Sequence, residues 1–142
     1  MIRSDVEHSR AVARVRDEQA RIETMRRELA ARGMSAAERK RVLDPVTSFH
    51  RQLVEEIEAY ERLQSGEFPA LVNLNGLGDL LVALRIHRGL SQRQLAELLG
   101  SHESQVSRDE RNDYHGITVA RASRILEVLG ASVSSQVVAV RS

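Results

Sequence analysis

Apolar residues recur at steps of three and four in the first part of the chain, with charged residues between them. This spacing places them on one face of an α-helix, so the segment is predicted to form an amphipathic helix. Gly33 follows and would end this helix as a left-handed glycine. The apolar positions of the stripe are Ala11, Val15, Ile22, Met25 and Leu29.

A second, longer stripe indicates a second helix, and its members are Val42, Val46, Phe49, Leu53, Ile57, Tyr60 and Leu63. Ser35 and Glu38 have the spacing of a capping box, so a helix can begin there. Pro45 is awkward inside a helix. Either Asp44 caps a helix whose first residue is Pro45, or a longer helix is kinked at this proline. The two stripes together predict an antiparallel helical hairpin over residues 1–64.

The hairpin is predicted to bind protein rather than DNA. Its thirteen basic and twelve acidic residues nearly cancel, so it has no electrostatic reason to seek phosphate. Its stripes either bury only each other or leave an exposed part that docks another chain. Because two helices alone bury little surface, we expect an exposed part that contacts a second copy of the chain, with a foreign partner as the alternative.

The second half of the chain has a different pattern. Residues 65–78 contain three Gly, two Asn, one Pro and one Ser and are predicted to be a linker. Residues 79–130 contain four apolar segments separated by glycines or by a polar loop, and they predict four helices. The first contains Leu80, Leu81 and Leu84 and ends at Gly89; the others cover Gln92 to Leu99 after a Ser91 cap, His102 to Arg111, and a segment from a Thr118 cap to Gly130.

The tail, residues 131–142, is rich in Val and Ser. This β-branched content predicts a short strand, which would need to pair with the tail of a second subunit or with another part of the chain. The alternative is a frayed tail that packs loosely on the preceding helices.

Composition narrows the class of protein. The chain of 142 residues is 42% hydrophobic, 29% charged and 3% aromatic and has two prolines, which favours an all-α globular fold. Zero cysteines exclude disulfides, thiolate zinc sites and iron–sulfur clusters. We find no signal peptide and no membrane-spanning run and expect a cytoplasmic location. No catalytic or nucleotide-binding motif is found, so we expect no enzyme activity, no metal and no cofactor.

The middle of residues 79–130 has the spacing of a helix-turn-helix. Two helices that cross steeply need a glycine in the turn, and Gly100 is placed there. The first helix needs a small residue at the crossing, which is Ala96, and the second needs an aliphatic anchor, which is Val106. Leu95 and Leu99 would complete the core.

These residues lie in two stretches, Leu84 to Gly100 and Gln105 to Glu110, that closely resemble the XRE family, the Cro and phage-repressor type of helix-turn-helix. The resemblance covers about residues 77–130. It implies a lambda-repressor-like domain of four to five helices that binds DNA. The order of a helical hairpin followed by this domain also resembles HigA-type antitoxins.

The resemblance to the XRE family assigns roles to single residues. Gln92 would fix the domain against a DNA phosphate. Arg108 would pair with guanine, and Glu103 would accept a hydrogen bond from cytosine. The residues expected to enter the major groove are His102, Glu103, Ser104, Ser107 and Arg108, and those expected to contact phosphates are Arg93, Gln105 and Asn112.

Two further positions concern the structure of the domain. Arg85 and Glu110 match a family pair that forms a partly buried ion pair between helices. Asp109 departs from the family, which usually has an apolar residue that packs inward there. A buried Asp needs a partner, for which we expect Arg88 or Arg111, unless the helix ends differently.

The sequence therefore predicts a dimeric, sequence-specific regulator that binds double-stranded DNA and represses by occupying an operator. The alternative is an antitoxin whose hairpin neutralises a toxin protein and which regulates its own operon through DNA binding.

Overall fold

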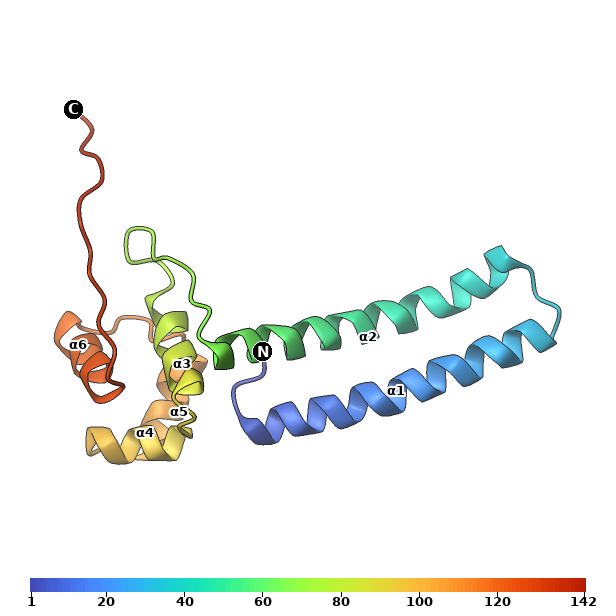
Figure 1. Ribbon diagram of the computed structural model, residues 1–142, viewed down its shortest axis with the longest axis horizontal. Coiled ribbons are helices and arrows are strands. Elements are labelled where there is room, and N and C mark those ends of the chain that lie inside the picture. The colour runs from blue at the N-terminus through green and yellow to red at the C-terminus, as the bar shows by residue number, and fades with distance from the viewer. The chain divides into compact units, whose positions relative to one another are not determined.

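The computed structural model describes residues 1–142 and contains six α-helices and no strand (Figure 1). The helices are α1 (Asp5–Ala31), α2 (Ala36–Ser65), α3 (Leu77–His87), α4 (Gln92–Leu99), α5 (Glu103–Arg111) and α6 (Val119–Val128). They form two compact units, Met1–Arg62 and Leu63–Ser142. The predicted all-helical fold is confirmed. None of the helices combines the length and the apolar character needed to cross a lipid bilayer.

The first unit is an antiparallel hairpin of α1 and α2 (Figure 1). Both helices begin at a serine cap: the Ser4 hydroxyl accepts a hydrogen bond from the Glu7 N–H, and the Ser35 hydroxyl accepts one from the Glu38 N–H, each at 3.2 Å. Gly33 adopts a left-handed conformation, with φ 72°, in the turn between the helices. The predicted stop at Gly33 and the predicted cap at Ser35 are therefore present.

The seam between the two helices follows a heptad spacing. Its buried and half-buried positions alternate steps of three and four along both helices, as in a coiled coil. Polar side chains of the seam are paired: His50 is 3.3 Å from Glu18, the Tyr60 hydroxyl donates to the exposed Asp5 at 2.7 Å, and the His8 ring is 3.1 Å from Glu61. The positions are His8, Ala11, Val15, Glu18, Ile22, Met25 and Leu29 in α1, and Leu43, Val46, His50, Leu53, Ile57 and Tyr60 in α2.

Pro45 lies inside α2, nine residues after its first residue. The predicted helix start at Asp44 is therefore wrong, and the longer helix that we considered as the alternative is the one formed. Proline removes one backbone hydrogen bond from the helix. Pro45 is exposed, so water can satisfy the carbonyl that loses its partner, and the helix continues.

The second unit packs α4, α5 and α6 around α3. Seven consecutive residues of α3, from Leu80 to Ile86, are buried, so this helix is covered on all sides. An ordinary surface helix buries one stripe, and a helix that is buried all round lies at the centre of its domain. The core contributed by the other helices consists of Leu95, Ala96, Val106, Ala122, Ile125 and Leu129.

The last turn of α2 and the segment predicted as a linker both contact α3. The His87 ring is 2.9 Å from the backbone oxygen of Gln64, and the Phe68 ring meets it edge-on. The helix begins at Leu77, two residues earlier than expected. Gly78 lies against the loop after α5 so closely that a Cβ there would be 1.9 Å from the Asp113 carbonyl oxygen.

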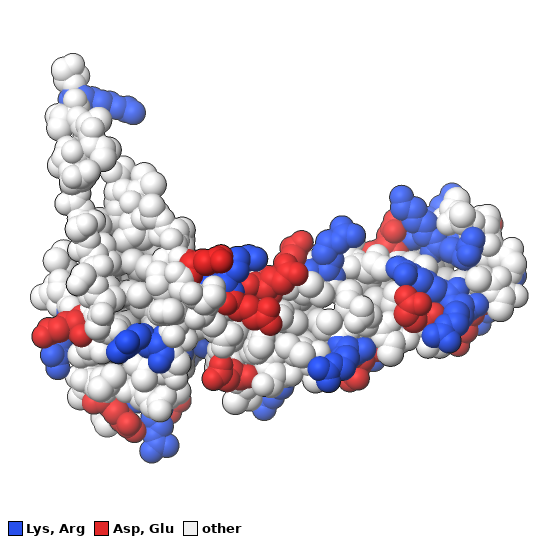
Figure 2. Space-filling view, in the orientation of Figure 1, with Lys and Arg blue, Asp and Glu red and all other residues white.

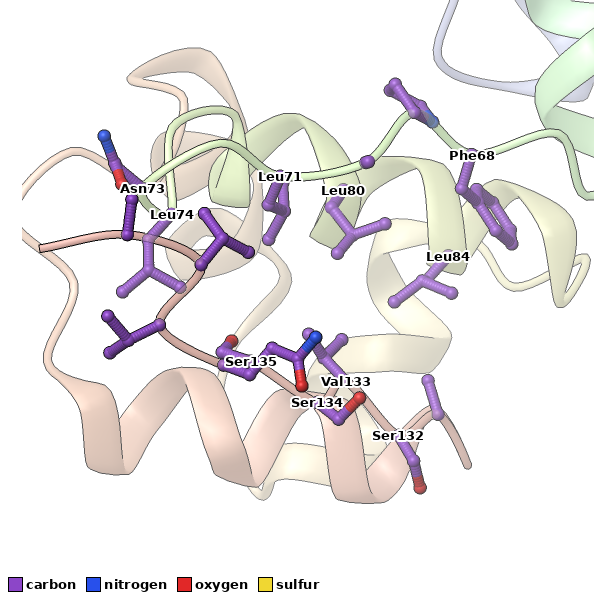
Figure 3. A pocket seen from close by; sticks show the side chains of 17 residues that line it. Phe68, Leu71, Asn73, Leu74, Leu80, Leu84, Ser132, Val133, Ser134 and Ser135 are labelled. Atoms are coloured by element: carbon purple, nitrogen blue, oxygen red, sulfur yellow. The ribbon is translucent and has the colours of Figure 1, made fainter.

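The tail after Gly130 forms no strand, so the predicted pairing with another part of the chain is wrong, and the pairing with the tail of a second subunit stays a prediction. It pairs with no other segment, and a strand without a partner is not stable. The tail instead runs across an apolar wall, and between them lies a groove of about 830 Å³ (Figure 3). Leu71, Leu74, Leu80 and Leu84 belong to this wall, and Val133 lies on the tail side.

Candidate nucleic-acid interface

Helices α4 and α5 and the short turn between them form the motif that the sequence predicts. The Ser91 hydroxyl accepts from the Gln94 N–H at 3.0 Å and the Gln94 side chain accepts from the Ser91 N–H at 2.8 Å, which is a complete capping box. Gly100 is left-handed, with φ 67°, and the Ser101 N–H donates to the Ala96 carbonyl. The glycine thus ends α4 and turns the chain into α5.

Helix α5 has one face in the core and one in solvent. Val106 and Glu110 are fully buried. The opposite face carries Ser104, Ser107, Arg108 and Arg111, all exposed except the half-buried Ser107. The spacing of these four residues places them on one side of the helix. Short hydroxyls and arginines on a rigidly supported helix are the groups that read base edges and phosphates in a major groove.

The beginning of α5 adds two of the predicted residues to this surface. His102 is the N-cap residue, and Glu103 is the first residue of the helix; both are exposed. The His102 side chain makes no capping hydrogen bond. The first backbone N–H groups of a helix have no intrahelical acceptor and favour anions. This end of α5 is therefore suited to a phosphate, whereas the Glu103 carboxylate is suited only to a donor.

The other predicted residues have different surroundings. Gln92 is half-buried, and its amide donates to the Glu110 carboxylate at 3.1 Å. Arg93 is exposed and lies 3.4 Å from Glu97 on the same helix. Gln105 is half-buried, and its amide is 3.3 Å from both carboxylate oxygens of Asp109. Asn112 is exposed at the end of α5.

Arg85 of α3 and Glu110 of α5 are in direct contact inside the unit. The Arg85 Nε and Nη2 atoms donate to the two Glu110 oxygens at 2.6 and 2.8 Å, and Nη1 donates to the Leu90 carbonyl at 2.8 Å. The two side chains are 2% and 0% exposed. Because Gln92 bonds to the same carboxylate, the pair joins the first residue of α4 to α5.

Asp109 is paired with a residue that we did not expect. Its carboxylate is 2.6 Å from the Arg121 guanidinium in α6, and it also accepts from Gln105. The predicted partners, Arg88 and Arg111, are therefore wrong. Asp109 sits on the side of α5 that faces α6, and the Arg121 cation compensates the desolvation of its half-buried carboxylate.

Arg111 is the residue of this surface that sequence reasoning missed. We considered it only as a partner for Asp109, but it is exposed and its Nη2 is 3.4 Å from the Ser107 hydroxyl. Arg111 follows Ser104 by seven residues and Ser107 by four, and this spacing places it on the same helical face. That periodicity was a signal available from the sequence.

Tyr114 lies directly behind this surface, in the loop after α5. It is left-handed, with φ 53°, and 4% exposed, and its hydroxyl has no hydrogen-bond partner. Burial raises the pKa of the phenol above its ordinary value, and the carboxylates of Glu110 and Asp109 raise it further. Tyr114 is therefore a neutral core residue rather than a proton donor or acceptor for a ligand.

The sequence of residues 81–135 matches the family model described as Helix-turn-helix. No curated protein and no solved structure matches the chain. The match begins inside α3, covers α4, α5 and α6, and ends in the tail. The geometry and the family match agree: the C-terminal part of the chain contains an XRE-type helix-turn-helix domain, the kind found in DNA-binding transcription regulators.

Proposed function

We propose that the protein is a sequence-specific regulator that inserts α5 into the major groove of an operator. The observation that carries this proposal is the outward face of α5, where Ser104, Ser107, Arg108 and Arg111 stand on a helix anchored by buried Val106 and Glu110. A binding surface of this kind needs no metal, cofactor or catalytic group.

Arg108 and Glu103 are the residues proposed to read sequence. A guanidinium can donate two hydrogen bonds to O6 and N7 of guanine, and a carboxylate can accept from N4 of cytosine. The backbone N–H groups at the start of α4, together with Arg93, are proposed to hold phosphates and so fix the register of α5. Gln92 reaches the same region, where its bond to Glu110 holds its side chain in place.

The proposed binding unit is a dimer, and the proposed effect is repression. Residues 65–142 carry eight basic and eight acidic residues, so a single domain gains little from general attraction to phosphate. Two domains whose recognition helices are about 34 Å apart would contact successive major grooves on one face of the duplex. A dimer in this position blocks a promoter by occupancy.

Such a regulator acts where the DNA is, which fits the cytoplasmic location expected from the sequence. The antitoxin alternative stays a prediction.

The test is binding-site selection from random or genomic duplexes, followed by footprinting on the selected operator. Arg108→Ala is expected to relax preference at one base pair and to cost about 1–3 kcal/mol on the operator. Gln92→Ala is expected to weaken binding to all sequences alike. Arg124→Ala, which removes an exposed arginine of α6, is the matched control. Operator binding that survives both Arg108→Ala and Gln92→Ala unchanged would refute this docking.

A further inference from the structure

Helix α2 has an apolar surface that α1 does not cover. Phe49 is 72% exposed and Val42 is 41% exposed, and Pro45 between them is exposed as well. The steps from 42 to 45 to 49 place the three side chains on one face of the helix. This face lies beside the seam, because the seam positions of α2 are Leu43, Val46 and His50. We call Val42, Pro45 and Phe49 the free face.

Charged residues lie before and after the free face along α2, and the prevailing sign differs between these two ends. The charged residues before it are Glu38, Arg39, Lys40 and Arg41, and Glu55, Glu56 and Glu58 lie beyond it, whereas Asp44 within it and Arg51 just after it have the opposite signs. Figure 2 shows mostly basic side chains, with some acidic ones among them, at the end of the hairpin where its two helices are joined, and mostly acidic ones over the later part of α2. Arg41 and Glu55 are fourteen residues, about four turns, apart and so lie on the same side of α2. At these two positions the surface carries a basic and an acidic residue that would meet each other in an antiparallel pair.

We propose that the free face binds the free face of a second copy of this chain, with the two α2 helices antiparallel. A two-fold axis near Phe49 brings the two Phe49 rings together and places Arg41 of one copy opposite Glu55 of the other. The same contact repeats on the other side of the axis, as it must in an interface that uses one patch twice. A parallel arrangement would instead place like charges opposite each other at both ends.

The small amount of apolar surface that one hairpin can bury favours a second copy of the chain as the partner of the free face. Two helices alone bury little apolar surface, whereas two hairpins joined through their α2 helices form a four-helix bundle with a larger core. Hydrophobic burial at Phe49 then supplies affinity, and the charges set orientation. The inference deepens the proposed function, since it names the surface that joins the two DNA-binding domains.

The first test measures the mass of the full chain by sedimentation equilibrium without DNA. We expect a reversible dimer, and we expect Phe49→Ser to raise the dissociation constant about tenfold or more, as loss of a central aromatic anchor does. Val6→Ser is the matched control, because Val6 is also apolar and 59% exposed but lies on α1. Circular dichroism checks that both variants keep the helical content of the parent.

The second test identifies the orientation by charge reversal at low salt. Arg41→Glu alone and Glu55→Arg alone each place two pairs of like charges across the antiparallel interface, so each is expected to weaken the dimer about five- to tenfold. The two changes in one chain recreate opposite pairs and are expected to restore the parent's dissociation constant. A parallel dimer would gain nothing from the combination.

A monomeric parent, a dimer that Phe49→Ser leaves unchanged, or a double reversal that fails to restore the dimer would each overturn the proposal. These results are separate from the DNA-binding proposal, because the mass is measured without DNA. The effects of Arg108→Ala are measured on the operator. A dimer that depends on Phe49 in a protein that binds no DNA would refute the proposed function and leave this inference standing.

Discussion

Arg85 and Glu110 make a two-point ion pair in the interior of the helix-turn-helix domain, with both carboxylate oxygens accepting from the guanidinium. Further contacts of the pair are to the Leu90 carbonyl and the Gln92 amide. The desolvated charges are therefore offset by hydrogen bonds that connect α3, the turn after it, α4 and α5. The position of α5 depends on this network as well as on apolar packing.

Removal of one partner leaves the other charge buried without its counterion. Arg85→Met alone or Glu110→Leu alone is expected to lower the free energy of unfolding by about 3–5 kcal/mol. The double variant, which buries neither charge, is expected to lose clearly less than the sum of the two single losses. Urea denaturation of the four proteins checks this. Additive losses would show that the pair is not coupled.

Local signals in the sequence predicted most of the domain, and long-range pairing accounts for what they missed. Ser91, Gly100 and Thr118 act on neighbouring residues, so their roles could be read from spacing. The partner of Asp109 could not, because Arg121 lies on another helix and only packing brings the two side chains together. Pro45 was misread for a related reason, since the cost of an internal proline depends on whether its surroundings are exposed.

Arg111 is expected to contribute to DNA binding, although sequence reasoning did not place it in the site. Its exposed guanidinium shares the outward face of α5 with Arg108. Arg111→Ala is expected to weaken binding to all duplexes and to lower the slope of log K against log salt by about one, as loss of one phosphate contact does. Titrations at several salt concentrations measure both. An unchanged slope and affinity would exclude Arg111 from the interface, and Arg124→Ala again serves as the control.

Gly78→Ala is expected to destabilise the domain, although alanine is the better helix former by about 1 kcal/mol. The added Cβ would be 1.9 Å from the Asp113 carbonyl oxygen, so backbone must move. The expected cost is about 1–3 kcal/mol, which is typical of overpacking. Asp79→Ala, at the exposed next position, is the control in thermal unfolding. A Gly78→Ala protein as stable as the parent would mean that α3 and the loop after α5 are not packed this closely.

The stability of the hairpin depends on pH through the Glu18 carboxylate. Burial opposes its charge, but hydrogen bonds from Arg14 and His50 outweigh burial and lower its pKa below the ordinary value of 4.5. The stabilisation is therefore present above pH 4.5 and is lost as the pH falls through the lower pKa of the folded state. Glu18→Gln is expected to reduce stability at pH 7 and to flatten the acid part of the curve, in contrast to Glu23→Gln on the exposed side of α1. Parallel acid curves for the parent and Glu18→Gln would contradict this.

Tyr114→Phe is expected to leave the domain as stable as the parent or to stabilise it by about 1 kcal/mol. A buried hydroxyl without a partner costs free energy, and phenylalanine keeps the ring while removing the oxygen. The gain is expected to grow as the pH rises past 10.0, the ordinary pKa of tyrosine, because the unfolded phenol ionises there while the folded one, with its raised pKa, stays neutral. Tyr114→Leu removes the aromatic ring as well as the hydroxyl and is expected to destabilise the domain. Urea denaturation at pH 7 and pH 11 measures all three proteins, and a large loss of stability in Tyr114→Phe at pH 7 would show that the hydroxyl is hydrogen-bonded in solution.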